Sequence, residues 1–149
     1  MSAGSPLEGE VPDNSGGAPG NSGAAPDDAT LALAHALLDA AREGNSELLG
    51  SYLAAGAPAT LTTSAGDSLV MLAAYHGHAG TVRLILDHGG DANMPNDRGQ
   101  TPLAGAVFKG YTDVVRELLD AGADPDAGTP SARAAAQMFA RTDILALLG

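Results

Sequence analysis

Residues 99–126 have the sequence GQTPLAGAVFKGYTDVVRELLDAGADPD, and residues 66–93 carry the same pattern 33 positions earlier. Nine positions of the two segments are identical, among them the glycine pair Gly77 and Gly110. A weaker copy precedes them, with Gly44 lying 33 positions before Gly77, and a shortened copy follows. Four units in a row with one period of this size indicate a stacked-repeat architecture.

The best-preserved unit predicts two short helices joined by a tight turn. Thr101 is suited to cap the first helix, with Pro102 in its first turn. Gly110 is expected to end that helix and Gly122 to end the second, because glycine adopts the left-handed C-terminal conformation most easily. Neither helix is long enough to be stable alone, so stacking against neighbouring units must supply the stability.

The motif Gly99-Gln-Thr-Pro-Leu103, followed by Gly110 and Gly122-Ala-Asp124, resembles the ankyrin repeat. The preceding unit matches through Leu72-Ala-Ala-Tyr-His-Gly-His78. The resemblance covers roughly residues 30–149. It implies an all-α fold, an ankyrin-repeat solenoid of about four stacked helix-turn-helix units with β-turn fingers.

The chain departs from the usual ankyrin motif at the position after Thr-Pro-Leu. The family usually has histidine there, but Met71 and Ala104 take that place in this sequence. The hydrogen bonds between helices that such a histidine supplies are therefore expected to be lost, which predicts modest stability.

Two regions follow from these patterns. The first 29 residues are rich in Gly, Ser, Ala and Pro and carry acidic but no basic side chains, so we expect a disordered acidic tail. That tail is interpreted either as an inert leader or as a partner-binding segment. The rest is expected to be the repeat domain, 30–149, divided into an N-terminal cap repeat (30–61), two full repeats (62–94 and 95–127) and a truncated C-terminal cap repeat (128–149).

Charge and composition exclude several classes of function. Lys and Arg total 7 and Asp and Glu total 18, a net charge of −11, which disfavours binding to nucleic acid or anionic lipid. The chain has no cysteine, so disulfides and thiol chemistry are excluded. Neither a secretory signal nor a membrane-spanning stretch is evident. We therefore expect a cytoplasmic protein, and the capped ends favour a monomer.

No motif indicates catalysis, a cofactor or a metal. Ser68 and Thr101 are explained as helix caps, and no nucleophile elbow, phosphate loop or dinucleotide fingerprint is present. His76 and His78 lie two positions apart and would point away from each other on a helix, which makes them poor co-ligands. We expect no enzymatic activity, no cofactor and no metal site.

The resemblance implies that partners dock on the concave face, which consists of the finger tips and the ends of the first helices. Tyr75, Phe108 and Phe139 are interpreted as an aromatic ladder on that face, or alternatively as partial core folded over the fingers. Aromatic residues and Arg are enriched in interface hot spots. The candidate partner-binding residues are Ser64, Ala65, Asp67, Asp97, Arg98 and Gln100 on the fingers, and Arg42, Glu43, Tyr75, His76, Phe108, Lys109, Met138 and Phe139 on the helices.

The resulting functional hypothesis is a non-catalytic module that binds one partner protein through the concave face. Two alternatives stay open at the level of sequence. An acidic, antitoxin-like inhibitor would block a basic enzyme, and its binding would weaken with salt. A passive companion would stabilise a neighbouring enzyme.

Overall fold

The computed structural model describes residues 28–149, and none of these residues lies in a strand. It confirms the predicted all-α repeat architecture, with a first helix that begins at Asp28, two residues before the predicted domain start. Residues 1–27 of the predicted tail lie outside the described part of the chain. The helices are α1 (Asp28–Glu43), α2 (Ser46–Ala54), α3 (Leu69–Tyr75), α4 (Ala79–Asp87), α5 (Pro102–Lys109), α6 (Thr112–Asp120), α7 (Ala132–Met138) and α8 (Thr142–Leu148).

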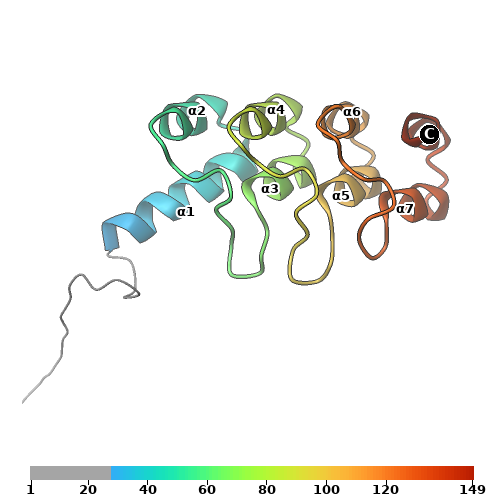
Figure 1. Ribbon diagram of the computed structural model, residues 1–149, viewed down its shortest axis with the longest axis horizontal. Coiled ribbons are helices and arrows are strands. Elements are labelled where there is room, and N and C mark those ends of the chain that lie inside the picture. The colour runs from blue at the N-terminus through green and yellow to red at the C-terminus, as the bar shows by residue number, and fades with distance from the viewer. Residues whose placement is uncertain (1–27) are drawn as a thin grey trace, which may run out of the picture. The chain divides into compact units, whose positions relative to one another are not determined.

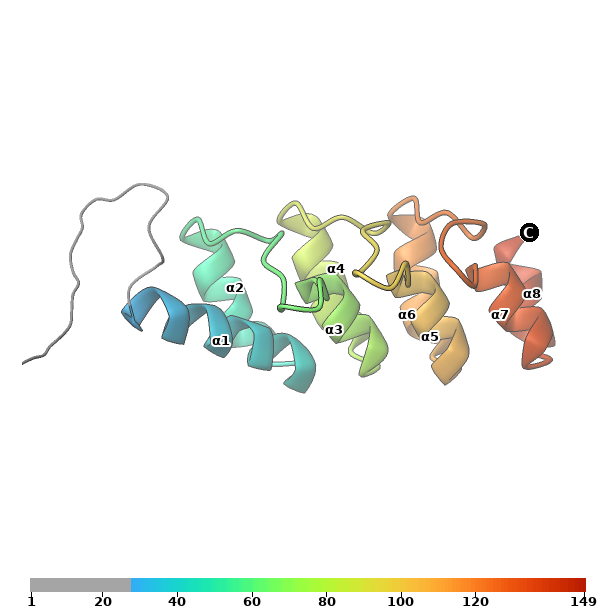
Figure 2. The ribbon, with the colours of Figure 1, turned by 90° about the horizontal axis from the view of Figure 1, so that it is seen from below.

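Of the described residues, 28–32 and 33–149 fall into separate units, and the following description concerns the second. Within it, the helices form two rows, which Figures 1 and 2 show from two directions. The first helices of the repeats, α3, α5 and α7, pack side by side. The second helices, α2, α4, α6 and α8, pack in the same way in the other row. Helices α3 to α6 therefore bury one side against the other helix of their own repeat and other sides against the neighbouring repeats.

Three first helices begin with the same cap. The hydroxyl groups of Ser68, Thr101 and Ser131 each accept a hydrogen bond from the backbone N–H three residues later. These bonds satisfy amide groups that have no partner inside the helix. Pro102 occupies the first turn of α5, as predicted, where its missing N–H has no cost.

Alanine recurs at one place in the core of every repeat. Ala40, Ala73, Ala106 and Ala136 are almost completely buried at equivalent places in the four repeats. Larger side chains, such as Leu103 and Leu118, fill the space between the two rows of helices. Small residues let the helix axes approach closely, so many short helices share one continuous core.

A side chain of each repeat covers the turn glycine of the repeat before it. A Cβ on Gly77 would lie 3.1 Å from the ring of Tyr111, and a Cβ on Gly110 would lie 3.0 Å from the guanidinium of Arg141. Both glycines also have positive φ, 81° and 78°, which favours glycine for its backbone alone. His78 covers Gly44 in the same way.

Backbone hydrogen bonds connect the finger turns of successive repeats. The N–H of Asp97 donates to the carbonyl oxygen of Ala65 at 3.0 Å, and the N–H of Thr129 donates to that of Gly99 at 3.0 Å. The finger turns thus form a continuous bonded row beside the first helices, which fixes their spacing.

A candidate protein-binding groove

A cavity of about 340 Å³ opens between the first helices α3, α5 and α7. Its walls are mostly apolar, and no charged side chain lines it. We call it the groove and define it by Met71, Tyr75, Gln100, Ala104, Gly105, Phe108, Pro130, Ala135, Met138 and Phe139.

Four of the large side chains that line the groove are exposed rather than folded into the core. Tyr75 is 39% exposed, Phe108 44%, Phe139 44% and Met138 67%. The rings of Phe108 and Phe139 meet edge to face, with 5.0 Å between their centroids. Such a cluster of accessible aromatic and methionine side chains is typical of surfaces that bind other macromolecules.

The three aromatic residues of the predicted ladder all line the groove, but Phe139 is not the repeat equivalent of Phe108. Ala140 has a φ of 54° and occupies the place of the turn glycine Gly110. Met138 therefore corresponds to Phe108, and Phe139 corresponds to Lys109. The equivalent positions carry Tyr75, Phe108 and Met138, because the last repeat follows a period of 30 here rather than 33.

The floor of the groove depends on a glycine inside a helix. Gly105 lies in the middle of α5, where glycine lowers helix stability by about 1 kcal/mol relative to alanine. A Cβ there would lie 3.2 Å from Cδ1 of Tyr75 and 3.8 Å from Sδ of Met71. The missing side chain thus lets Tyr75 lie against α5.

A smaller and more polar cavity of about 140 Å³, which we call the polar cavity, adjoins the groove and shares Met71, Tyr75 and Gln100 with it. Its other walls include Asp67, Asn96 and Arg98. A ligand that fills the groove can therefore reach polar side chains on the fingers without leaving the surface.

Asn96, which is not among the residues predicted from the sequence, organises this polar side. Its buried side chain accepts from the N–H groups of Arg98 and Gln100, both at 3.0 Å. Its amide group donates to Oδ1 of Asp67 at 2.8 Å and to Oε1 of Gln100 at 2.9 Å. The available signal was the repeat itself, since Thr63, 33 positions earlier, makes the corresponding side-chain bonds in its own finger.

The positive charges near the groove are not used in ion pairs with other described residues. Nζ of Lys109 lies 4.7 Å from the ring centroid of Tyr75, an arrangement in which the ring attracts the cation. Neither Lys109 nor Arg98 forms an ion pair within residues 28–149. Arg42, Arg83 and Arg133, in contrast, are paired with Asp39, Glu117 and Asp126.

His76 stands beside Tyr75, with 5.9 Å between the ring centroids. Desolvation by partial burial, followed by the positive charge of Lys109, lowers the pKa of His76 below its ordinary value of 6.5. The imidazole is therefore neutral at neutral pH.

The remaining candidate residues lie away from the groove walls. Arg42 and Glu43 are exposed at the end of α1, and Arg42 is held by Asp39 at 2.6 Å. Ser64, Ala65 and Asp97 are exposed on the fingers, whereas Asp67 is half-buried and bonded to Asn96. The structure thus brings together five of the predicted residues at the groove: Tyr75, Gln100, Phe108, Met138 and Phe139.

Two other kinds of structure are absent from the described residues. Among residues 28–149, no three His, Asp or Glu side chains are placed to hold a metal ion together. Within the same part of the chain, no helix combines the length and the apolar character that crossing a membrane requires.

Residues 37–129 match the family model for ankyrin repeats in three copies. This match covers more than half of the chain, and the chain belongs to the ankyrin-repeat family. Ankyrin repeats form protein–protein interaction modules, a generally non-enzymatic fold. The matched region ends just before α7, so the repeat with the shifted period lies outside it.

A relative from Pseudomonas aeruginosa supports this assignment. PA3287, which is described as an ankyrin repeat protein, is 54% identical to the chain over 55 residues. The matched stretch covers 37% of this chain and 32% of the relative. The chain thus spans about a third of the length of the curated relative that it matches.

Proposed function

We propose that this chain is a non-catalytic interaction module that binds a partner protein through the face formed by its first helices and fingers. The groove is the observation that carries the proposal. It combines exposed aromatic side chains with an apolar cavity, and such anchors dominate the binding energy of protein interfaces. The partner is a protein, and the chain acts as a cytoplasmic monomer.

A pull-down from the native cell tests the proposal directly. We expect the triple variant Tyr75→Ala, Phe108→Ala and Lys109→Ala to recover much less of the partner than the unchanged chain does. Truncation of a single hot-spot residue already costs about 2 kcal/mol or more of binding free energy. The matched control is Tyr52→Ala with Arg116→Ala, which removes an exposed aromatic and an exposed cation from the second helices.

Both variants should show the same circular dichroism spectrum and the same elution volume as the unchanged chain. A groove variant that recovers the partner as well as the control does would refute the assigned face. Size-exclusion chromatography with light scattering tests whether the chain is a monomer. Imaging of the tagged chain in the native cell tests whether it is cytoplasmic.

The acidic inhibitor is a second candidate, and the distribution of carboxylates supports it. Exposed acidic residues lie along the row of second helices, namely Glu47, Asp87, Asp113, Asp120 and Asp143. A basic enzyme would dock on this opposite row. Its binding would fall steeply as salt screens the exposed charges, and it would survive the groove variant. Partner recovery by both variants across a salt series therefore separates the two candidates.

A further inference from the structure

We propose that the groove binds an extended peptide segment in which a bulky apolar side chain lies beside an Asp or Glu residue. This inference rests on the proposed function and narrows it to one class of ligand. It follows from three features of the groove: its apolar floor, the unpaired cations beside it, and a side-chain amide held in a fixed direction.

The apolar part of the ligand follows from the cavity walls. Small side chains at Gly105, Ala104 and Ala135 leave the space, and Phe108 and Met138 line it. Its volume of about 340 Å³ is at the small end of the range of roughly 300–1,000 Å³ for ligand pockets. That space suits one or two large apolar side chains, and no charged side chain lines it to receive a buried ion.

The acidic part of the ligand follows from charge complementarity. The chain carries a net charge of −11, yet Lys109 and Arg98, the cations nearest the groove and the polar cavity, have no carboxylate partner among residues 28–149. Lys109 lies over the ring of Tyr75, which also lines both cavities. A carboxylate next to the anchoring apolar side chain would meet these cations, whereas a basic ligand would be repelled by them.

The peptide character follows from Gln100, which lies between the two cavities. Its Oε1 accepts a hydrogen bond from the amide of Asn96, so its own NH₂ group is the part that faces away from Asn96. Asn96 also accepts from the N–H of Gln100, which fixes the backbone beneath. The NH₂ group is thus set to donate to a main-chain carbonyl of a ligand that crosses from one cavity to the other.

The test is selection from a phage-displayed library of random peptides on the full chain. We expect selected peptides to be enriched in Phe, Tyr, Leu or Met adjacent to Asp or Glu. Repeating the selection on the double variant Arg98→Glu with Lys109→Glu should replace the acidic residues by Lys or Arg and retain the apolar anchor. Met138→Asp, which changes a highly exposed wall residue, should remove the apolar preference.

A matched pair of single variants then measures the charge effect with one selected peptide by fluorescence polarisation. Lys109→Glu should weaken binding roughly five- to tenfold, as loss and reversal of an exposed ion pair predict. Arg116→Glu makes the same charge change on α6, away from the groove, and should leave the affinity unchanged.

The outcomes separate this inference from the proposed function. Peptides that depend on Phe108 and Met138 but show no acidic preference would overturn the inference and leave the groove as a binding site. Peptides that bind the groove variants as well as the unchanged chain would overturn both. A double variant that still selects acidic peptides would overturn the assigned role of Arg98 and Lys109.

Discussion

The third repeat, α5–α6, and the fourth, α7–α8, share one plan but differ in how many neighbours support them. Helices α5 and α6 pack against α3 and α4 on one side and against α7 and α8 on the other. Within the described chain, α7 and α8 have such neighbours on one side only. The turn residue also differs, because Gly110 has a φ of 78° while Ala140 adopts a left-handed φ of 54°. The end repeat therefore tolerates backbone strain with less packing to offset it.

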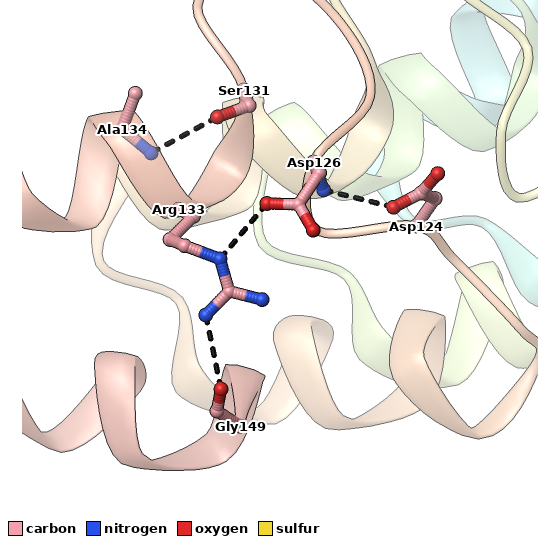
Figure 3. Close-up of polar contacts among 6 residues, drawn as sticks. All are labelled: Asp124, Asp126, Ser131, Arg133, Ala134 and Gly149. Carbon is pink, nitrogen blue, oxygen red and sulfur yellow. Dashed lines mark hydrogen bonds and ion pairs between the residues drawn. The ribbon is translucent and has the colours of Figure 1, made fainter.

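The fourth repeat has a polar link that holds its two helices to the preceding turn. Figure 3 shows Arg133, whose Nε donates to Oδ1 of Asp126 at 2.8 Å and whose Nη1 donates to the carbonyl oxygen of Gly149 at 3.1 Å. The hydrogen bond with Asp126, together with its charge, raises the pKa of Arg133. The third repeat is packed on two sides, whereas the fourth repeat, packed on one side within the described chain, has this link between its two helices and the preceding turn.

The largest expected effect on stability comes from shortening a buried side chain in the core of the third or the fourth repeat. Leu118→Ala removes a fully buried side chain of α6 and should cost about 3–5 kcal/mol of unfolding free energy. Leu148→Ala, in the one-sided α8, should cost about 2 kcal/mol, because the end repeat can relax into the space. Urea unfolding followed by circular dichroism measures both. Equal losses would show that the end repeat is packed as firmly as the interior one.

Substitutions at the two turn residues should change the free energy of unfolding in opposite directions. Gly110→Ala should lower the unfolding free energy by about 1–2 kcal/mol, because it places a side chain at positive φ under Arg141. Ala140→Gly should raise it by about 1 kcal/mol, because it relieves the left-handed strain. Thermal unfolding compares the two variants, and a destabilised Ala140→Gly chain would contradict the strained-turn interpretation.

Loss of the polar link should destabilise only the fourth repeat. Arg133→Ala removes the contacts to Asp126 and Gly149, so we expect faster amide hydrogen exchange in α7 and α8 and unchanged exchange in α3 to α6. Arg116→Ala, an exposed arginine of the interior repeat, is the matched control. Faster exchange along the whole stack would mean that the link stabilises more than the end repeat.

The smallest effect concerns the position that precedes the turn residue, where one repeat has His76 and the last has Phe139. NMR titration of the His76 ring should give a midpoint below 6.5, and Lys109→Ala should move it upward. The folded chain binds this proton less readily than the unfolded chain, so the stability linked to His76 is fully present above pH 6.5 and is lost as the pH falls from there through the lower pKa of the folded chain. A midpoint that is unchanged in Lys109→Ala would refute the effect of the Lys109 charge on His76.

The repeat pattern predicted the helices and their ends with good accuracy because caps and turn glycines are local signals. Thr101, Pro102 and Gly110 took the roles expected of them. The pattern could not show the cavity, which arises from the absence of a side chain at Gly105 and from helices far apart in sequence. The repeat equivalence of Phe139 was offset by one residue because the last repeat is shortened and has alanine where a glycine would mark the turn.

The way in which each repeat covers the turn glycine of its predecessor makes the architecture extensible. Because Tyr111 meets Gly77 as Arg141 meets Gly110, a duplicate of residues 78–110 inserted after Gly110 would find a matching surface at both of its junctions. The lengthened chain would gain another pair of helices and another segment of binding surface while keeping its specialised end. Modular growth of this kind offers evolution, or a protein engineer, a simple means of recognising longer targets.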